Sequence, residues 1–220
     1  MNISEYIEHT LLKQDATKDG LAKLFEEAKE NNFLGVCVNP CFVRDAKTVL
    51  KDSDVKIVTV IGFPLGANTS EVKAFETKKA LEDGADEIDM VINVSKLKDK
   101  DFEYVKQDIE AVRHACPNNI LKVILETDLL TKDEIKKACE ICIDAKADLV
   151  KTSTGFVKNG VGAKVEDVEL MYKTVSPFGL KVKASGGIRD SEKALALIKA
   201  GATRLGTSSG LKIAEEMRNK

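Results

Sequence analysis

The sequence predicts an α/β protein with a single (β/α)8 TIM barrel that spans residues 1–220 as one domain. Three observations support this prediction: eight short apolar runs typical of β-strands, segments of helical periodicity between them, and a chain length of 220 residues. Eight alternating strand and helix units in a chain of this size favour a closed barrel over an open doubly wound sheet. Hydrophobic residues make up 43% of the chain, so a sizeable core is available and a disordered or collagen-like protein is excluded.

The predicted strands recur along the whole chain. Their ranges are 7–10, 35–39, 56–61, 87–92, 121–126, 148–153, 180–185 and 203–206. Between the strands, apolar residues recur at helical spacing, as in the stretch 72–81 with Val72, Phe75, Ala80 and Leu81. The order is therefore a βα unit repeated eight times.

The charge balance limits the classes of partner. Lys and Arg number 34 and Asp and Glu number 36, which gives a formal net charge of −2 and no basic field for nucleic acid. No apolar run approaches the roughly 18–20 residues that cross a bilayer, and residues 1–5 lack the order of a signal peptide. We therefore expect a cytoplasmic protein that binds neither nucleic acid nor a membrane.

The cysteines and histidines do not form a recognisable metal or redox motif. The chain has five cysteines, an odd number, and they lie in otherwise apolar segments, so buried free thiols are expected rather than a redox or zinc site. With two histidines in all, no ligand set is visible, and no metal is expected.

Polar residues can be assigned to a face of the barrel, because successive side chains of a strand point alternately outward and inward. In the fourth predicted strand, the apolar Ile88 and Met90 fit the helix layer, which places Asp89 inside. In the seventh, the same alternation places Lys181 and Lys183 inside. The fifth strand turns Lys122 and Glu126 away from its apolar face, and in the sixth Lys151 shares a face with Ser153.

Lys151 and Lys183 each come late in a strand, near the carboxyl ends where barrel active sites are built. Two desolvated ammonium groups repel each other, which lowers the pKa of at least one and leaves some neutral amine to form an imine with a carbonyl. The alternative is that both lysines form structural ion pairs with Asp89 and Glu126. Asp89 itself suits either structural pairing or proton transfer beside an imine.

A phosphate site is predicted at the ends of the last two strands. Gly186 and Gly187 follow the seventh strand, and Gly206, Ser208 and Ser209 follow the eighth. Glycines allow close approach of the backbone, and the two serines can begin the last helix with N–H groups that face an anion. Barrels often bind phosphate at these two loops.

Six motifs in one order resemble those of the deoxyribose-phosphate aldolases, a family of class I aldolases. They are IEHTLL at 7–12, VCVNP at 36–40, GFPLG at 62–66, GADEIDMV at 84–91, VKTSTGF at 150–156 and KASGGIR at 183–189. The resemblance covers nearly the whole chain. It implies reversible cleavage of 2-deoxy-D-ribose 5-phosphate to acetaldehyde and D-glyceraldehyde 3-phosphate, with no metal or other cofactor.

The resemblance also implies roles for individual residues. Lys151 would form the imine, Lys183 would tune it, and Asp89 would relay protons with an ordered water. Cys37 matches a thiol position that lies near the substrate in some relatives. The phosphate would rest on Gly186, Gly187, Gly206, Ser208 and Ser209, with Gly155 nearby.

The chain differs from the family pattern at three places. Glu8 stands where the first motif commonly has Asp, Phe156 stands where some relatives have Lys, and the end of the chain lacks the tyrosine of some longer relatives.

Two other functions stay open from the residues alone. A sugar-phosphate isomerase or epimerase would use the same anion site with a carboxylate base and no imine, and a non-catalytic phosphosugar-binding barrel would keep the site without turnover. The oligomeric state is also left open, with a homo-oligomer one of the outcomes.

Overall fold

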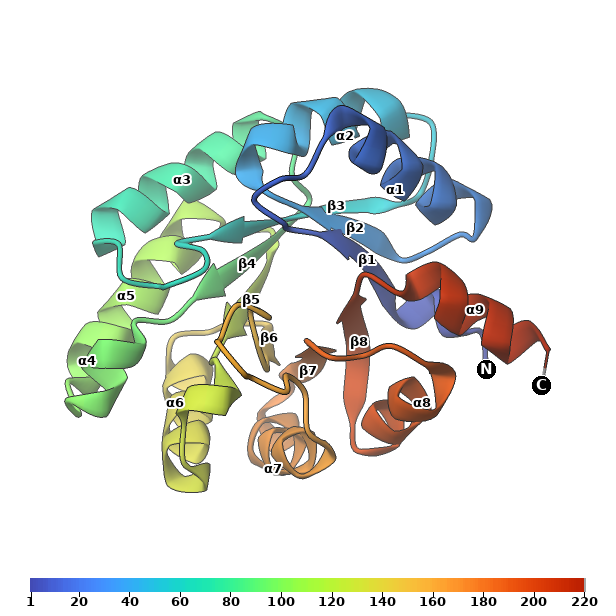
Figure 1. The fold of residues 1–220 in the computed structure, drawn as a ribbon. Helices are drawn as coiled ribbons and strands as arrows, with labels where there is room; N and C mark the ends of the chain where they lie inside the picture. The colour runs from blue at the N-terminus through green and yellow to red at the C-terminus, as the bar shows by residue number, and fades with distance from the viewer. Residues whose placement is uncertain (220) are drawn as a thin grey trace.

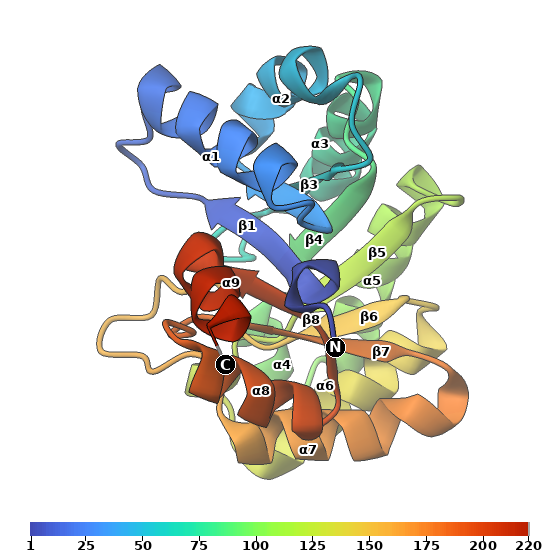
Figure 2. The same ribbon diagram turned by 90° about the vertical axis from the view of Figure 1, so that its right-hand side faces the viewer.

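The computed structural model describes residues 1–219. Its centre is a closed barrel of eight parallel strands in chain order, in which β1 also pairs with β8 (Figures 1 and 2). The strands are β1 (Ile7–Leu11), β2 (Gly35–Val38), β3 (Lys56–Ile61), β4 (Glu87–Val91), β5 (Ile120–Ile124), β6 (Leu149–Lys151), β7 (Lys181–Ser185) and β8 (Ala202–Thr207). The predicted fold class and all eight strands are confirmed.

Helices form the outer ring around the strands (Figure 1). They are α1 (Lys18–Glu30), α2 (Val43–Leu50), α3 (Ser70–Glu82), α4 (Val94–Lys98), α5 (Phe102–Ala115), α6 (Lys132–Asp144), α7 (Val165–Val175), α8 (Ser191–Lys199) and α9 (Gly210–Arg218). Short 3-10 helices occur at Ile3–Tyr6, Pro40–Phe42, Thr127–Leu129 and Ser176–Phe178. Within residues 1–219, no helix has the length and apolar character that a membrane span requires.

The sixth strand, β6, is shorter than the predicted run 148–153, and beyond Thr152, whose backbone still bonds to Lys183 and Thr127, side chains take over the hydrogen bonding. The Ser153 N–H donates to the Ser185 hydroxyl, and the Thr154 N–H donates to the Glu126 carboxylate. These side chains replace the strand-to-strand hydrogen bonds that would have extended β6.

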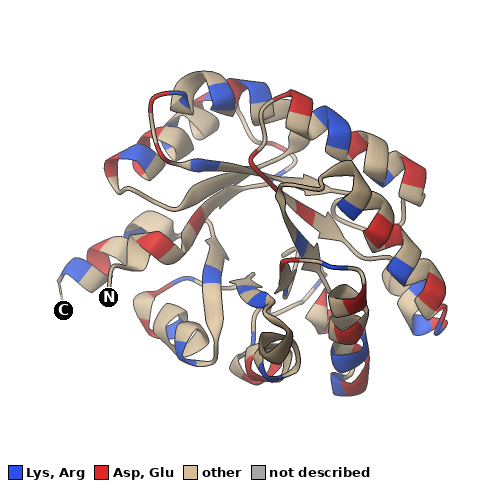
Figure 3. Cartoon of the chain, turned by 180° about the vertical axis from the view of Figure 1, so that it is seen from behind, with Lys and Arg blue, Asp and Glu red and all other residues tan. Residues whose placement is uncertain are grey.

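The main core lies between the outward face of the strands and the helices. Ile88 and Met90 are fully buried there, as the alternation along β4 predicts. Charged residues of both signs are distributed over the outer helices (Figure 3). All five cysteines are free, and four are buried, but Cys41 is exposed, so the expectation of buried thiols is wrong for Cys41. Cys41 lies in the 3-10 helix that follows β2, where the chain is already at the surface.

Helix α3 departs from the usual amphipathic arrangement. Its outward side carries Val72 and Phe75, which are 48% and 71% exposed, whereas its inward side carries the buried Lys73 and Thr77. Lys73 donates to Asp108 of α5 over 2.5 Å and to the carbonyl of Val91 at the end of β4 over 2.9 Å. The apolar residues at helical spacing therefore do mark a helix, but two of them do not join the core.

Candidate active site

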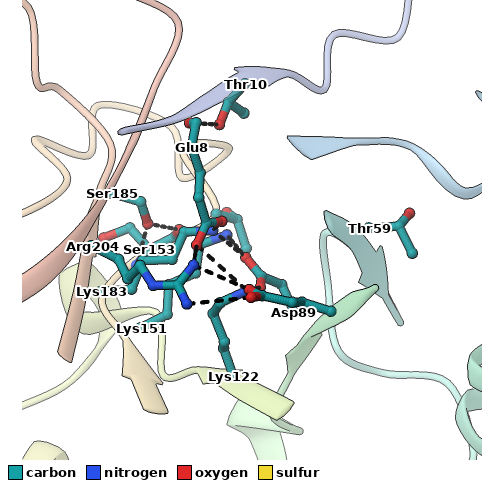
Figure 4. Close-up of polar contacts among 12 residues, drawn as sticks. Glu8, Thr10, Thr59, Asp89, Lys122, Lys151, Ser153, Lys183, Ser185 and Arg204 are labelled. Atoms are coloured by element: carbon teal, nitrogen blue, oxygen red, sulfur yellow. Dashed lines mark hydrogen bonds and ion pairs between the residues drawn. The ribbon is translucent and has the colours of Figure 1, made fainter. Parts of the chain in front are cut away.

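Asp89 of β4 lies at the centre of the barrel and accepts hydrogen bonds from three lysines (Figure 4). Lys151 of β6 and Lys183 of β7 both donate to Oδ2, each over 2.7 Å, and Lys122 of β5 donates to Oδ1 over 3.0 Å. Asp89, Lys122 and Lys183 are fully buried and Lys151 is 3% exposed. The alternation of the strands accounts for this meeting, because all four side chains point inward from neighbouring strands.

A second layer of charge lies beside this centre. Glu8 of β1 contacts Lys183 and lies 3.5 Å from Lys122, and Glu87 of β4 lies 2.6 Å from Lys122. Arg204 of β8 bridges the two glutamates, at 3.3 Å from Glu8 and 3.2 Å from Glu87. Four cations and three anions therefore form one connected network, which compensates charges that would be costly to bury singly.

The network sets the ionisation of its members. Burial alone would raise the pKa of Asp89, but the ammonium groups of Lys122, Lys151 and Lys183 outweigh burial and hold that pKa well below its usual value. Burial opposes the charge of Lys183, but Asp89 and Glu8 raise its pKa above the usual lysine value. Asp89 is therefore a carboxylate and Lys183 an ammonium at neutral pH.

A cavity of about 260 Å³ opens above this centre at the carboxyl ends of the strands. Lys151 lies at its floor, and the residues predicted to hold phosphate line its wall. These are Gly155, Gly186, Gly187, Gly206, Ser208 and Ser209. Ser209 is the N-cap residue of α9, so N–H groups of that helix's first turn lie beside the cavity.

Glycine is required at the end of β7. Gly186 and Gly187 have φ values of 85° and 67°, a left-handed conformation that side chains disfavour. A Cβ on Gly187 would also lie 2.4 Å from the carbonyl oxygen of Val161. At β8, a Cβ on Gly206 would lie 3.1 Å from Cε of Lys183, so this glycine leaves room for the lysine.

The chain matches the family model described as DeoC/LacD family aldolase over residues 5–216. The chain belongs to the DeoC/LacD aldolase family. The deoxyribose-phosphate aldolase of Finegoldia magna is 56% identical over 215 residues, which cover 98% of this chain and 100% of that protein. The deoxyribose-phosphate aldolase of an Exiguobacterium species is 57% identical over 214 residues, which cover 97% of this chain and 96% of that protein.

Solved structures resemble this chain over nearly its whole length. The crystal structure of a putative deoxyribose-phosphate aldolase from Coccidioides immitis superposes with a TM-score of 0.96 at 46% identity, covering 99% of this chain and 86% of that one. A tetrameric deoxyribose phosphate aldolase from Aeropyrum pernix superposes with a TM-score of 0.90 at 34% identity, covering 99% and 91%.

Some predicted residues of this aldolase-family chain lie apart from the cavity. Cys37 is fully buried among Leu12, Val58 and Val60 and does not line the cavity, and burial raises the pKa of its thiol to about 11. Lys181 is exposed at the start of β7, so the prediction that it lies inside the barrel is wrong. Lys181 is the first residue of β7, at the amino-terminal end of the strand, where alternation between the two faces does not ensure burial.

Glu126 does not pair with either lysine. Its carboxylate accepts from both the N–H and the hydroxyl of Thr154, and burial raises its pKa. The neighbouring Asp128 accepts from the Gly162 N–H over 2.8 Å. The two acids of this family member therefore fix both ends of the loop between β6 and α7, which forms one wall of the cavity with Gly155.

Five charged residues of the site were not assigned a role from the sequence: Glu8, Glu87, Lys122, Arg189 and Arg204. Arg189 lines the cavity beside Gly187 and makes no ion pair within the described residues. The alternation along β5 does place Lys122 inward, but it gives this lysine no partner and no role. Arg204 and Glu8 are 196 residues apart in the chain, so no local pattern links them.

Proposed function

We propose that this chain is a class I aldolase that reversibly cleaves 2-deoxy-D-ribose 5-phosphate to acetaldehyde and D-glyceraldehyde 3-phosphate through an imine on Lys151. The observation that carries the proposal is the position of Lys151, between a buried Asp89–Lys183 pair and a glycine-lined cavity. The names of relatives about 56% identical over nearly the whole chain support the same substrate. These names support an aldolase over the two alternatives, a sugar-phosphate isomerase or epimerase and a non-catalytic phosphosugar-binding barrel.

Lys151 supplies the nucleophile. Its neutral amine attacks C1 of the open-chain sugar, and loss of water leaves a protonated imine. The C2–C3 bond then breaks as the C3 hydroxyl loses its proton, so that C3 becomes the aldehyde carbon of D-glyceraldehyde 3-phosphate, which leaves. The electron pair of the broken bond moves toward the imine nitrogen to give an enamine. Protonation of C2 and hydrolysis of the imine release acetaldehyde and restore Lys151.

Asp89 and Lys183 move the protons. Asp89 stays ionised beside Lys122, Lys183 and the protonated imine on Lys151, so it accepts and passes on protons with a water molecule rather than storing one. When the Lys151 nitrogen becomes the neutral nitrogen of the enamine, Asp89 loses one of these charges and becomes a better proton acceptor. Lys183 keeps its own charge and disfavours a second charge on Lys151.

The phosphate fits the opposite end of the cavity. Gly186, Gly187 and Gly206 bring backbone close to the ligand, Ser208 and Ser209 offer hydroxyls and the α9 N-terminus, and Arg189 adds a positive charge. Gly155 completes the wall. Such a site distinguishes the phosphorylated sugar from free deoxyribose.

The proposal also includes the cellular location and the oligomeric state of this enzyme. A sugar phosphate does not cross membranes freely, which suits a cytoplasmic enzyme. The Aeropyrum pernix relative is named as a tetramer, which supports a homo-oligomer here.

Borohydride trapping tests the proposal. Incubation with acetaldehyde and borohydride should convert one lysine, Lys151, to a stable secondary amine that peptide mass mapping locates. Lys151→Arg keeps the charge and should give no adduct. An adduct on another lysine, or none, combined with isomerase activity on a sugar phosphate, would overturn the proposal. Pretreatment with a chelator should leave cleavage unchanged, because the imine replaces a metal as the electron sink.

A further inference from the structure

We propose that His9 is a positioning residue for the phosphate of the substrate, because its ring supports the first turn of α9 while Glu27 of α1 holds that ring in place. The inference rests on the proposed function and deepens it, since it concerns how the phosphate end of the same site is built. His9 belongs to the IEHTLL motif at 7–12 and does not line the active-site cavity.

His9 lies where β1 meets the end of β8. In the parallel pairing of these two strands, His9 is in register with Thr207, the last residue of β8. Ser208 and Ser209 follow directly, and α9 begins at Gly210. β1 lies between α1 and α9 in Figure 2, so a side chain on the outward face of β1 can reach both helices.

Two contacts fix the ring of His9. Its Nε2 lies 2.7 Å from Oε2 of Glu27, and because a carboxylate oxygen only accepts, Nε2 donates this hydrogen bond. The ring of Phe33 packs against it edge to face, with the two ring centroids 5.3 Å apart. Both rings are buried, so the imidazole cannot turn without disturbing the close packing around it.

The third contact of the ring is with α9. A Cβ on Gly210 would lie 2.8 Å from Nδ1 of His9 and 3.0 Å from Cγ2 of Ile7. The helix therefore begins as close to β1 as a backbone without a side chain allows. Nδ1 is buried and has no hydrogen-bond partner within residues 1–219, so the ring meets α9 by packing alone.

The first turn of α9 carries the donors that the phosphate needs. In the part of the chain that the structure describes, the N–H of Ile213 is the first of this helix to bond to a backbone carbonyl, that of Ser209. The N–H groups of residues 210–212 are therefore free to face an anion. Hydrogen bonds to an anion depend on distance and angle, so the position of this turn relative to β1 determines how well it binds phosphate.

The same turn is open on the side that faces α1. A cleft of about 670 Å³ lies between α1 and α9, and His9 and Glu27 line it together with Ser208 and Ser209. The two helices do not pack against each other across this cleft. The ring of His9 is thus the connection between Glu27 and the loop that holds the phosphate.

Steady-state kinetics with two sugars tests the role of His9. His9→Leu keeps an apolar side chain but loses the bond to Glu27, so KM for deoxyribose 5-phosphate should rise about tenfold while kcat stays within about twofold. For unphosphorylated deoxyribose, kcat/KM should stay within about twofold, because this sugar has no phosphate to place on α9. His9→Gln places an amide N–H near the position of Nε2 and should restore most of the affinity. His114→Leu, the same change at an exposed position of α5, is the matched control and should keep the parent KM.

Gly210→Ala tests the same contact from the other side. Its methyl group would meet Nδ1 of His9, so the first turn of α9 must move away from β1, and KM for deoxyribose 5-phosphate should rise in the same way. Alanine is a better helix former than glycine, so the helix itself is not weakened. If circular dichroism shows that His9→Leu does not fold, Gly210→Ala decides the question.

Borohydride trapping with acetaldehyde separates this inference from the proposed function. Acetaldehyde has no phosphate, so the parent, His9→Leu and Gly210→Ala should form the Lys151 adduct at the same rate. A parent that forms no adduct would contradict the imine on Lys151, and the inference would fall with it. If the adduct forms, the inference is overturned by a KM for deoxyribose 5-phosphate that neither variant changes, by equal losses for both sugars, or by a His9→Gln variant no better than His9→Leu.

Discussion

Lys151 and Lys183 share one acceptor atom, because each donates to Oδ2 of Asp89 over 2.7 Å (Figure 4). Their two nitrogens can lie no farther apart than twice that distance. Each positive charge therefore opposes the other while Asp89 attracts both. The raised pKa of Lys183 keeps that side chain charged, so Lys151, which lines the cavity, is the lysine placed to act as the nucleophile.

Asp89→Asn should keep the fold and permit slow imine formation but reduce carbon–carbon cleavage by about 10²-fold or more, the usual loss for an acid/base group. Glu87→Gln is the matched control, because Glu87 is the other inward carboxylate of β4 and contacts Lys122 and Arg204 instead. Steady-state cleavage and trapped-adduct rates measure the two effects. Near-normal cleavage by Asp89→Asn would return Asp89 to a purely structural role.

Lys183→Leu should reduce the rate of borohydride-trapped adduct at neutral pH by at least about tenfold, with partial recovery toward about pH 9–10. The reason is that Lys183 supplies a like charge beside the attacking nitrogen, which disfavours a second positive charge there, whereas a higher pH increases the neutral fraction of any amine. Lys181→Leu, an exposed change two residues earlier on β7, should leave the profile unchanged. Superimposable pH profiles for Lys183→Leu and the parent would mean that Lys183 does not tune Lys151.

Ser208→Asp should raise KM for deoxyribose 5-phosphate far more than it raises KM for unphosphorylated deoxyribose. The new carboxylate would repel the phosphate dianion at the α9 N-terminus. Ser208→Asn introduces a side chain of the same shape as Asp but without the charge, so it should raise KM for deoxyribose 5-phosphate much less. The comparison is KM for the two sugars, and equal losses for both would place the phosphate elsewhere.

Glu8→Gln should change the pH dependence of stability in acid. Burial would raise the pKa of Glu8, but Lys122 and Lys183 outweigh burial and lower it, so the carboxylate stabilises the fold above the unfolded pKa of about 4.3. That contribution is lost as pH falls through the lower folded pKa. The variant should lose about 3 kcal/mol in the free energy of unfolding at neutral pH, as for a broken buried pair, and its stability should fall less steeply in acid.

Denaturant unfolding at several pH values measures this difference. The exposed Glu26→Gln serves as the control. Parallel acid profiles for Glu8→Gln and the parent would contradict the role of Glu8 in the network.

Cys37 should react slowly with iodoacetamide at pH 7–8, whereas the exposed Cys41 should react first. Burial raises the pKa of Cys37 to about 11, so only a small fraction is thiolate, and the side chain is also fully covered. Peptide mapping after timed alkylation measures both sites. Modification of Cys37 as fast as Cys41 in the folded protein would contradict this expectation.

The sequence by itself determined the architecture and the inward face of the fourth, fifth and seventh strands. Alternation along a strand is a local property, so Asp89, Lys122 and Lys183 could be placed inside the barrel from their neighbours alone. The glycines and serines after β7 and β8 could be placed at the cavity because the carboxyl ends of parallel strands share one end of a barrel.

Only the tertiary structure decided how deep each inward side chain lies in the barrel and which residues it contacts. Alternation predicts one face for Lys181 and Lys183, yet Lys181 is exposed and Lys183 is fully buried, because the depth of a side chain depends on the stagger of all eight strands. The network of Glu8 with Lys183 and Arg204 joins the two ends of the chain when the barrel closes, and no sequence period links residues 196 apart. The outward position of Phe75 was likewise decided by packing, since the bond from Lys73 to the end of β4 determines which side of α3 faces the sheet.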